Sequence, residues 1–247
     1  MSKTSTPNVR VLESPADVAA AGAEAFVRAA GLAIAARGRF AVALSGGSTP
    51  KAMLALLAEA PHAVKVDWRH THLFWSDERC VGPEDPDSNY GMARHALLSG
   101  GLVPDANVHR MMGELEPHVG ALDYNLRLRS FFGVTTPVFD LIYLGLGPDG
   151  HTASLFPHTE ALKVADQPCA ANRVDSGVAS PWRLTLTYSA LNAGRAAVFL
   201  TEGSAKAEIL QKVLSGPVDP ALLPAQGVVP KRGALTWLVD RAAASLL

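Results

Sequence analysis

The sequence predicts an α/β fold, a single domain built on an open, mainly parallel sheet with helices on both faces. Short apolar runs alternate along the chain with segments in which apolar residues recur at helical spacing, which indicates βαβ units. Several runs are apolar at every position, as in parallel strands that helices cover on both sides. The 247 residues, 48% of them hydrophobic, suffice for one large core. We therefore expect one domain over residues 1–247, with residues 1–10 flexible.

A helix and a buried strand open the pattern. Ser14 and Pro15 suit a helix start, and Ala-rich apolar spacing extends the helix from Asp17 to Arg37. The continuous apolar run Phe40–Leu44 then predicts a buried strand. The same criteria predict, in order, a helix at Lys51–Glu59, a strand at His70–Trp75, a helix at Tyr90–Leu98, a short strand at Val108–Met112 and a helix at Val119–Phe132.

The strongest strand signal of the chain lies in its second half, at Phe139–Leu146, and it ends among glycines. Arg183–Thr187 alternates between apolar and polar residues, which predicts a strand with one solvated face. We read the Pro-rich stretch Pro217–Pro230 as a long surface loop. The remaining elements are a strand at Ala196–Thr201, a helix at Ala205–Leu214, a strand at Leu235–Val239 and a closing helix at Arg241–Leu247.

Composition and charge exclude several classes of protein. With 22 basic and 23 acidic residues the net charge is −1, which argues against a nucleic-acid partner. Cys80 and Cys169 form no disulfide framework and lack metal-ligand spacing, which favours a reducing compartment. No apolar run approaches the ~18–20 residues of a membrane span, and Met1–Arg10 lacks the apolar core of a signal peptide. A cytoplasmic enzyme or small-molecule-binding domain without a membrane partner is the expectation.

Polar turns that contain glycine follow three of the predicted strands, after Leu44, Leu146 and Leu200. Because ligands of an open parallel sheet bind beyond the carboxyl ends of its strands, these turns could line one pocket. In the first of them, the backbone and the helix start behind it suit an anion such as phosphate. An ordinary Ser/Thr helix cap is the alternative. The candidate phosphate-binding residues of this turn are Gly46, Gly47, Ser48 and Thr49.

The second turn carries a candidate catalytic pair. His151 follows directly on a buried strand and a glycine turn, so its imidazole should project into the pocket. Asp149, two residues earlier, could orient the ring and hold its tautomer. For the other His residues we prefer a surface or satisfied core position. His70 and His72 would share a strand face, but no third ligand supports a metal, so we expect none.

Charged residues at two other strand ends complete the candidate set. Asp77 and Arg79 follow the strand that ends at Trp75 and suit substrate hydroxyls and an anion, unless they belong to a solvated charge run. Arg183 opens a strand. Lys206 lies near a helix start, where a cation is unfavourable unless an anion is close by, although it could be one exposed lysine among many.

These motifs together resemble those of the 6-phosphogluconolactonase family, and the resemblance extends over nearly the whole chain. GPDGHTASLFP is the most specific of them, and SGGSTP is shared more widely. The resemblance implies an open, Rossmann-like sheet and no metal or nucleotide cofactor. The motifs occur in the order Ser45–Pro50, Ser76–Arg79 with Asp87–Tyr90, Gly145–Pro157, Arg183–Thr187 and Gly203–Ala207.

The resemblance further implies an activity of the pentose phosphate pathway, the hydrolysis of 6-phospho-D-glucono-1,5-lactone to 6-phosphogluconate by a cytoplasmic monomer. His151 would be the general base on the attacking water and Asp149 its orienting group. Arg79 would help with the developing oxyanion or the sugar hydroxyls, and Asp77 would bind substrate. The glycine turn from Gly46 to Thr49, Arg183 and Lys206 would hold the 6-phosphate.

Three other functions compete with this interpretation. Glucosamine-6-phosphate deaminases of this fold carry a Glu five residues after the His, where this chain has Phe156. They also typically read Asp-Glu-Tyr where this chain has Asp77-Glu78-Arg79. A sugar-phosphate sensor of a transcriptional regulator would need a DNA-binding module. A dinucleotide-dependent oxidoreductase would need the motif GxGxxG after a strand, and the sequence has none.

Overall fold

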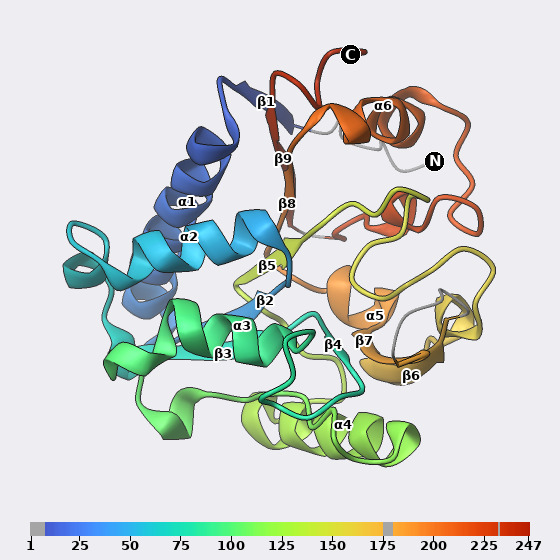
Figure 1. Ribbon diagram of the computed structural model, residues 1–247. Helices are drawn as coiled ribbons and strands as arrows, with labels where there is room; N and C mark the ends of the chain where they lie inside the picture. Colours follow the sequence, from blue (N-terminus) through green and yellow to red (C-terminus); the bar gives the residue numbers. More distant parts are fainter. Residues whose placement is uncertain (1–7, 175–179, 232) are drawn as a thin grey trace.

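Parallel pairing unites six strands in the main sheet of the computed structural model, which describes residues 8–174, 180–231 and 233–247 (Figure 1). Every neighbouring pair in this sheet runs parallel. Each of the three central strands is buried at nearly every position, which is why their sequences are continuously apolar. In sheet order the strands are β1 (Asn8–Leu12), β9 (Ala234–Asp240), β8 (Ala196–Thr201), β5 (Leu141–Leu144), β2 (Phe40–Leu44) and β3 (Thr71–Trp75).

Helices pack on both sides of the sheet, as the sequence predicts. Figure 1 shows α1 and α2 on one side of the strands and α6 on the other. The start of α1 is capped by Ser14, whose side chain accepts the Asp17 N–H, and its end by Gly38 at φ +73°. The helices are α1 (Pro15–Arg37), α2 (Ser48–Ala58), α3 (Asn89–Ala96), α4 (Pro117–Phe132), α5 (Tyr188–Leu191) and α6 (Ala207–Ser215).

Helix α1 corrects one statement of the sequence analysis. Its 23 residues are long and apolar enough in composition to cross a membrane. Its many alanines raise the mean hydropathy of the helix. Its apolar side chains pack in the core, where Val18, Phe26 and Ala30 are buried, and α1 packs on α2 and β9. In this structure α1 is a covering layer of the sheet.

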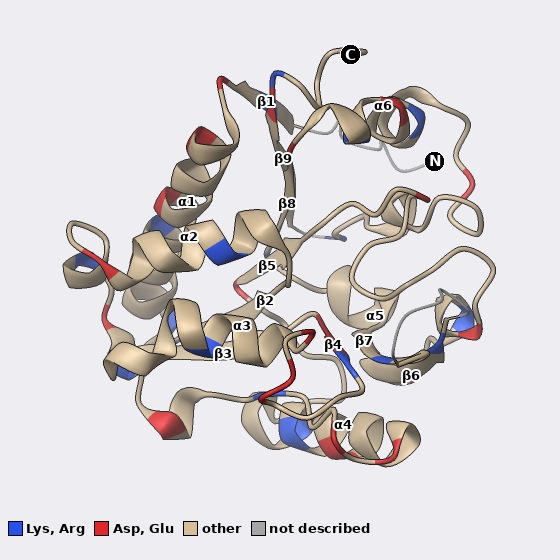
Figure 2. Cartoon of the chain, viewed as in Figure 1, with Lys and Arg blue, Asp and Glu red and all other residues tan. Residues whose placement is uncertain are grey.

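A second, antiparallel sheet lies beside the first in the described chain, and the sequence predicts one of its three strands. Its order is β4 (Asp77–Arg79), β7 (Trp182–Leu186) and β6 (Cys169–Arg173), with α4 packed on β6 and β7. The strand β4 follows β3 after one residue, so the polar segment that begins at Asp77 is held in place by pairing with β7. Charges of both signs are spread over the helices and loops of both parts (Figure 2).

The structure corrects the predicted elements at four places. Asn8, Val9 and Arg10, expected to be flexible, pair with β9; the residues before them lie outside the described part. Val108–Met112 forms a single bridge, from Val108 to Leu73, and no strand. Arg241–Leu247 forms turns, because so short a segment does not nucleate a helix without further packing. His70 lies in a 3-10 turn before β3 and pairs with Asp67, so it shares no strand face with His72.

Candidate active site

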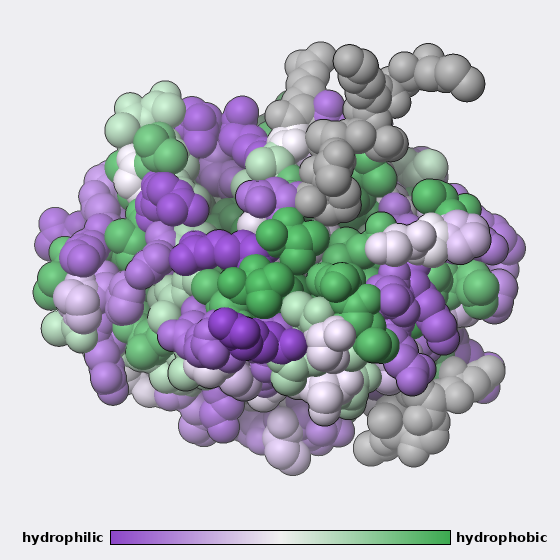
Figure 3. All heavy atoms as spheres, turned by 90° about the horizontal axis from the view of Figure 1, so that it is seen from above, coloured by the Kyte–Doolittle hydropathy of each residue, from purple (hydrophilic) through white to green (hydrophobic). Residues whose placement is uncertain are grey.

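A cavity of about 620 Å³ opens at the carboxyl ends of β2, β5 and β8. The three glycine-containing turns meet there, as expected for ligand sites of parallel sheets. The space-filling view from above shows polar and apolar residues mixed over the side of the molecule that faces the viewer (Figure 3). All the site residues predicted from the sequence line this cavity, namely Gly46, Gly47, Ser48, Thr49, Asp77, Arg79, Asp149, His151, Arg183 and Lys206.

His151 and Asp149 form a hydrogen-bonded pair on the cavity wall. The Nδ1 of His151 lies 2.6 Å from the Oδ1 of Asp149, which also accepts the backbone N–H of His151. A tight turn sets this geometry, because the Gly147 N–H donates to the His151 carbonyl and Gly150 adopts φ +82°. Burial acts to raise the pKa of Asp149, but the hydrogen bond and charge of His151 outweigh it and the pKa is lowered. The carboxylate therefore stays ionised beside the ring.

Asp77 is a buried carboxylate whose two oxygens are both engaged. Its side chain is among those nearly covered, at 6% exposure. The hydroxyl of Ser154 donates to its Oδ2 at 2.6 Å, and the Nδ2 of Asn89 donates to its Oδ1 at 3.2 Å. Ser154 belongs to the same turn as His151. Asp77 thus ties the His151 turn to β4, in addition to facing the cavity.

Glu78 is not among the residues that line the cavity, and it holds the start of α3. It is 2% exposed and accepts the backbone N–H groups of Arg79, Asn89 and Tyr90. Burial raises its pKa to about 7, although these backbone donors act in the opposite direction. This carboxyl joins β4 to α3, and its neighbours in sequence are the cavity residues Asp77 and Arg79.

Arg79 and Arg183 lie directly opposite each other on the antiparallel strands β4 and β7. Arg183 is 7% exposed, and burial followed by the charge of Arg79 lowers its pKa. Like charges in this position are destabilising unless a counter-charge is present. The nearby Asp77 and Asp87 supply part of it, and a bound anion in the cavity would supply more. This wall is therefore suited to an anionic ligand.

The first turn of α2 presents backbone N–H groups that no described side chain caps. Gly47, at φ +110°, leads into it, and a side chain at Gly46 would collide with Asn89. The Ser48 hydroxyl, predicted from the sequence as a phosphate donor, instead donates to Glu202 at 2.7 Å. The backbone of this turn is the part available to an anion.

Lys206 lies between α6 and the His151 turn and also lines the cavity. Burial lowers its pKa, while the charge of Asp149 acts to raise it. Among the described residues no group of three His, Cys, Asp or Glu side chains could hold a metal ion. His72, weighed as a ligand from the sequence, instead contacts His109, with Nδ1 and Nε2 3.3 Å apart.

Among the cavity residues that were not predicted from the sequence, four have side chains that contact predicted site residues: Asn89, Ser154, Phe156 and Glu202. The motifs Asp87–Tyr90 and Gly145–Pro157 contain three of them, Asn89, Ser154 and Phe156. Their place in these motifs was the feature of the sequence that could have indicated a role in the site. Glu202 follows the third strand end, and its contact with Ser48 joins residues 154 positions apart. No local pattern reports a contact over that distance.

Comparison with known proteins identifies close relatives of this chain. Residues 13–237 match the family described as glucosamine-6-phosphate isomerases/6-phosphogluconolactonase. A 6-phosphogluconolactonase of Synechocystis sp. is 43% identical over 85% of this chain and 86% of its own length. The solved 6-phosphogluconolactonase of Trypanosoma brucei is 29% identical with a TM-score of 0.86, covering 98% of both chains. A solved monomeric glucosamine-6-phosphate deaminase, 18% identical over 97% of this chain and 100% of its own with a TM-score of 0.80, shares the fold.

Proposed function

The chain belongs to the family of glucosamine-6-phosphate isomerases and 6-phosphogluconolactonases and hydrolyses 6-phosphogluconolactone in the pentose phosphate pathway, and we propose that His151 is the general base of this reaction. The observation that supports this role most directly is the His151–Asp149 hydrogen bond inside a cavity lined by Arg79, Arg183 and Lys206. A base and an anion-binding wall in one cavity suit a phosphorylated ester.

In the proposed mechanism, the Nδ1–H of His151 donates a hydrogen bond to Asp149, so Nε2 carries the free lone pair. Nε2 removes a proton from a water molecule as the water oxygen attacks the lactone carbonyl carbon. The carbonyl π electrons move to oxygen, and Arg79 stabilises the resulting oxyanion or binds the sugar hydroxyls. When the oxyanion collapses, the bond to the ring oxygen breaks, and the imidazolium returns the proton to that oxygen. The product is 6-phospho-D-gluconate.

The 6-phosphate is proposed to lie between the α2 turn, Arg183 and Lys206. The uncapped N–H groups of that turn and the two cations face one cavity, and a phosphate dianion would relieve the repulsion between Arg79 and Arg183. Binding of this remote group fixes the lactone carbonyl relative to His151, so the binding energy of the phosphate orients the reacting groups. Asp77 is proposed to contact sugar hydroxyls as well as to hold its two protein partners.

Deaminase activity is a poorer fit to the cavity. The position five residues after His151 holds Phe156, whose ring faces the imidazole and cannot transfer a proton. Purified protein should therefore release no ammonia from glucosamine 6-phosphate while it hydrolyses the lactone.

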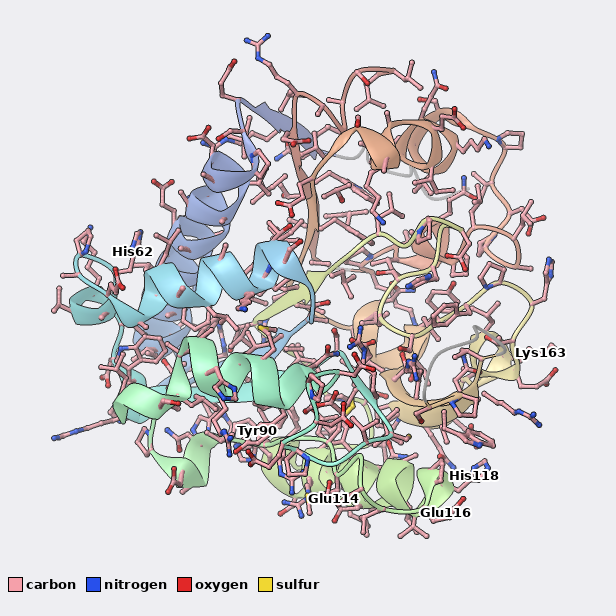
Figure 4. All side chains as sticks on the ribbon, viewed as in Figure 1. His62, Tyr90, Glu114, Glu116, His118 and Lys163 are labelled. Carbon is pink, nitrogen blue, oxygen red and sulfur yellow. The ribbon has the colours of Figure 1, made fainter. Side chains whose placement is uncertain are left out.

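The role of His151 is tested by His151→Ala and Asp149→Asn in an assay coupled to 6-phosphogluconate dehydrogenase and corrected for spontaneous hydrolysis. Loss of a general acid–base lowers kcat by about 10²–10⁴-fold, and KM should move little because the phosphate contacts remain. His62→Ala is the control, since His62 lies in the turn after α2 and outside the cavity (Figure 4). Turnover of His151→Ala near that of the wild type would refute the assignment.

We also propose that the enzyme acts as a cytoplasmic monomer, without a nucleic-acid or membrane partner. The near-neutral net charge supports the absence of a nucleic-acid partner, and the relatives named 6-phosphogluconolactonase support a metabolic enzyme. Light scattering coupled to gel filtration should report a mass near 26.0 kDa. A mass of twice that value at micromolar concentration would contradict the monomer.

A further inference from the structure

We propose that Phe156 is a positioning residue for His151, and that its ring holds the imidazole in the orientation that turns Nε2 toward the cavity. The inference rests on the proposed role of His151 as general base. It concerns how the ring is held rather than what the ring does, and the two are tested separately below.

The rings of Phe156 and His151 stack face to face. Their centroids are 4.0 Å apart and their planes differ by 25°. Both side chains line the cavity and both are half-buried. An offset or stacked aromatic pair at this distance contributes beyond the burial of its area, so the contact biases the orientation of the imidazole.

The backbone of Gly147 lies against the other face of the imidazole. A Cβ atom at Gly147 would be 2.0 Å from the Nδ1 and 2.2 Å from the Cε1 of His151. Such a point lies over the ring rather than in its plane, and Phe156 already covers one face, so Gly147 covers the opposite one. Any side chain at position 147 would displace the imidazole. The ring is therefore enclosed between an aromatic plane and bare backbone.

The chain turns sharply to bring Phe156 back over His151. The Leu155 N–H donates to the Thr152 carbonyl at 2.9 Å, and the Thr152 hydroxyl donates to the Gly145 carbonyl at 2.9 Å. Ala153 adopts φ +46°, a left-handed conformation that is unfavourable for a residue with a side chain. Strain of this kind persists where the surroundings impose it, and the buried Ser154 is anchored on Asp77.

Together these contacts leave one ring position open. Asp149 binds Nδ1, Phe156 and Gly147 cover the two faces, and Nε2 has no hydrogen-bond partner among the described residues. Rotation of the ring about its Cβ–Cγ bond would lift it off Phe156, put Cδ2 in place of Nδ1 beside Asp149 and move Nε2 to the position of Cε1. Holding a base in its reactive orientation removes an orientational cost from the transition state.

The test compares Phe156→Leu with Phe156→Tyr. Leucine keeps an apolar side chain but removes the stacked plane, so kcat should fall about 3–10-fold with KM within twofold, while tyrosine should restore kcat to within twofold. Phe131→Leu is the matched control, because Phe131 is also half-buried but lies on α4 outside the cavity. If Phe156→Leu does not fold, Phe156→Met replaces it.

Nitrogen NMR measures the tautomer of the His151 ring, which a general loss of stability would not change. In the wild type and in Phe156→Tyr, Nδ1 should carry the proton of the neutral ring; in Phe156→Leu the two tautomers should mix. Unchanged kcat and an unchanged tautomer in Phe156→Leu would overturn the positioning role while His151→Ala stays inactive. Activity in His151→Ala would instead overturn the proposed function itself.

Discussion

Replacing Glu78 with Ala should destabilise the protein and lower its activity, although Glu78 does not face the cavity. The carboxyl accepts the N–H groups of Arg79, Asn89 and Tyr90 at 2.8, 2.7 and 2.8 Å. It also accepts the hydroxyl of Ser88 at 3.1 Å. These bonds close the segment between β4 and α3 onto the strand, and an acidic group at the start of a helix also interacts favourably with its dipole.

The magnitude follows from the donors that alanine would leave without a partner. Each buried unsatisfied donor costs about 1–3 kcal/mol. Water that enters the vacated space would satisfy some of them, and burial already penalises the charged form of Glu78, since it raises the pKa to about 7. We expect the free energy of unfolding to fall by about 3 kcal/mol, and Tm to fall by about 6–12 °C in a chain of this length. Glu78→Gln keeps one acceptor oxygen and should lose about half as much.

Activity should fall because the same segment carries two cavity side chains. The Nη1 of Arg79 donates to the Asp87 carbonyl at 2.5 Å, and Asn89 donates to Asp77. With Glu78 gone, both positions loosen, and kcat/KM should fall about tenfold, as a loss of about 1.4 kcal/mol in transition-state binding would give.

Chemical denaturation at pH 8 measures the free energy of unfolding, and the coupled lactonase assay at 20 °C measures kcat/KM below the melting range. Glu84→Ala is the control, because Glu84 lies in the same segment but is exposed and pairs with Arg94 at the surface. Glu84→Ala should leave the free energy of unfolding close to that of the wild type, because an exposed ion pair contributes little. If Glu78→Ala lowers it no more than Glu84→Ala does, the anchoring role of Glu78 is wrong.

Four further predictions follow from the site and its surroundings. Lys206→Ala should lower kcat/KM for the phosphorylated lactone about 10–150-fold but change hydrolysis of unphosphorylated gluconolactone far less, with Lys212→Ala as control; equal losses on both lactones would count against a phosphate contact. Glu202→Gln should lower KM for the phosphorylated lactone about fivefold, because it removes a charge that repels the phosphate yet keeps an acceptor for Ser48; an unchanged KM would place the phosphate elsewhere. Activity should survive exhaustive dialysis against EDTA, and loss that a divalent ion restores would reveal a metal requirement. Burial, and then the charges of His72 and Arg127, lower the pKa of His109 to about 4, so the unfolded chain binds a proton between pH 6.5 and 4 that the native state excludes. The free energy of unfolding of the wild type should therefore fall by about 1–2 kcal/mol relative to that of His109→Gln between pH 7.5 and 5. Glu78 titrates in the opposite sense, but both proteins contain it, so its contribution cancels in the comparison. The difference would be absent if His109 were freely solvated.

Local sequence patterns determined the main sheet, apart from its edge strand β1, and where its ligand site lies. Phe40–Leu44 and Ala196–Thr201 were predicted with the bounds of β2 and β8, because strands covered on both faces must be apolar at each position. The turns behind them meet at one edge because parallel strands point the same way, so the predicted site residues converge on one cavity. The strands β4 and β6 were not predicted, because their sequences lack the apolar pattern that indicates a buried strand.

Tertiary structure alone decided how the site residues meet. Arg79 faces Arg183, Ser48 donates to Glu202, and Ser154 donates to Asp77, 77 residues away in the chain. The pairing of β4 with β7 and the close approach of distant turns create these contacts, and neither leaves a periodic trace in the sequence. Hydrophobic periodicity records which side of an element is buried, whereas a polar contact depends on which two elements the packed core brings within hydrogen-bond distance.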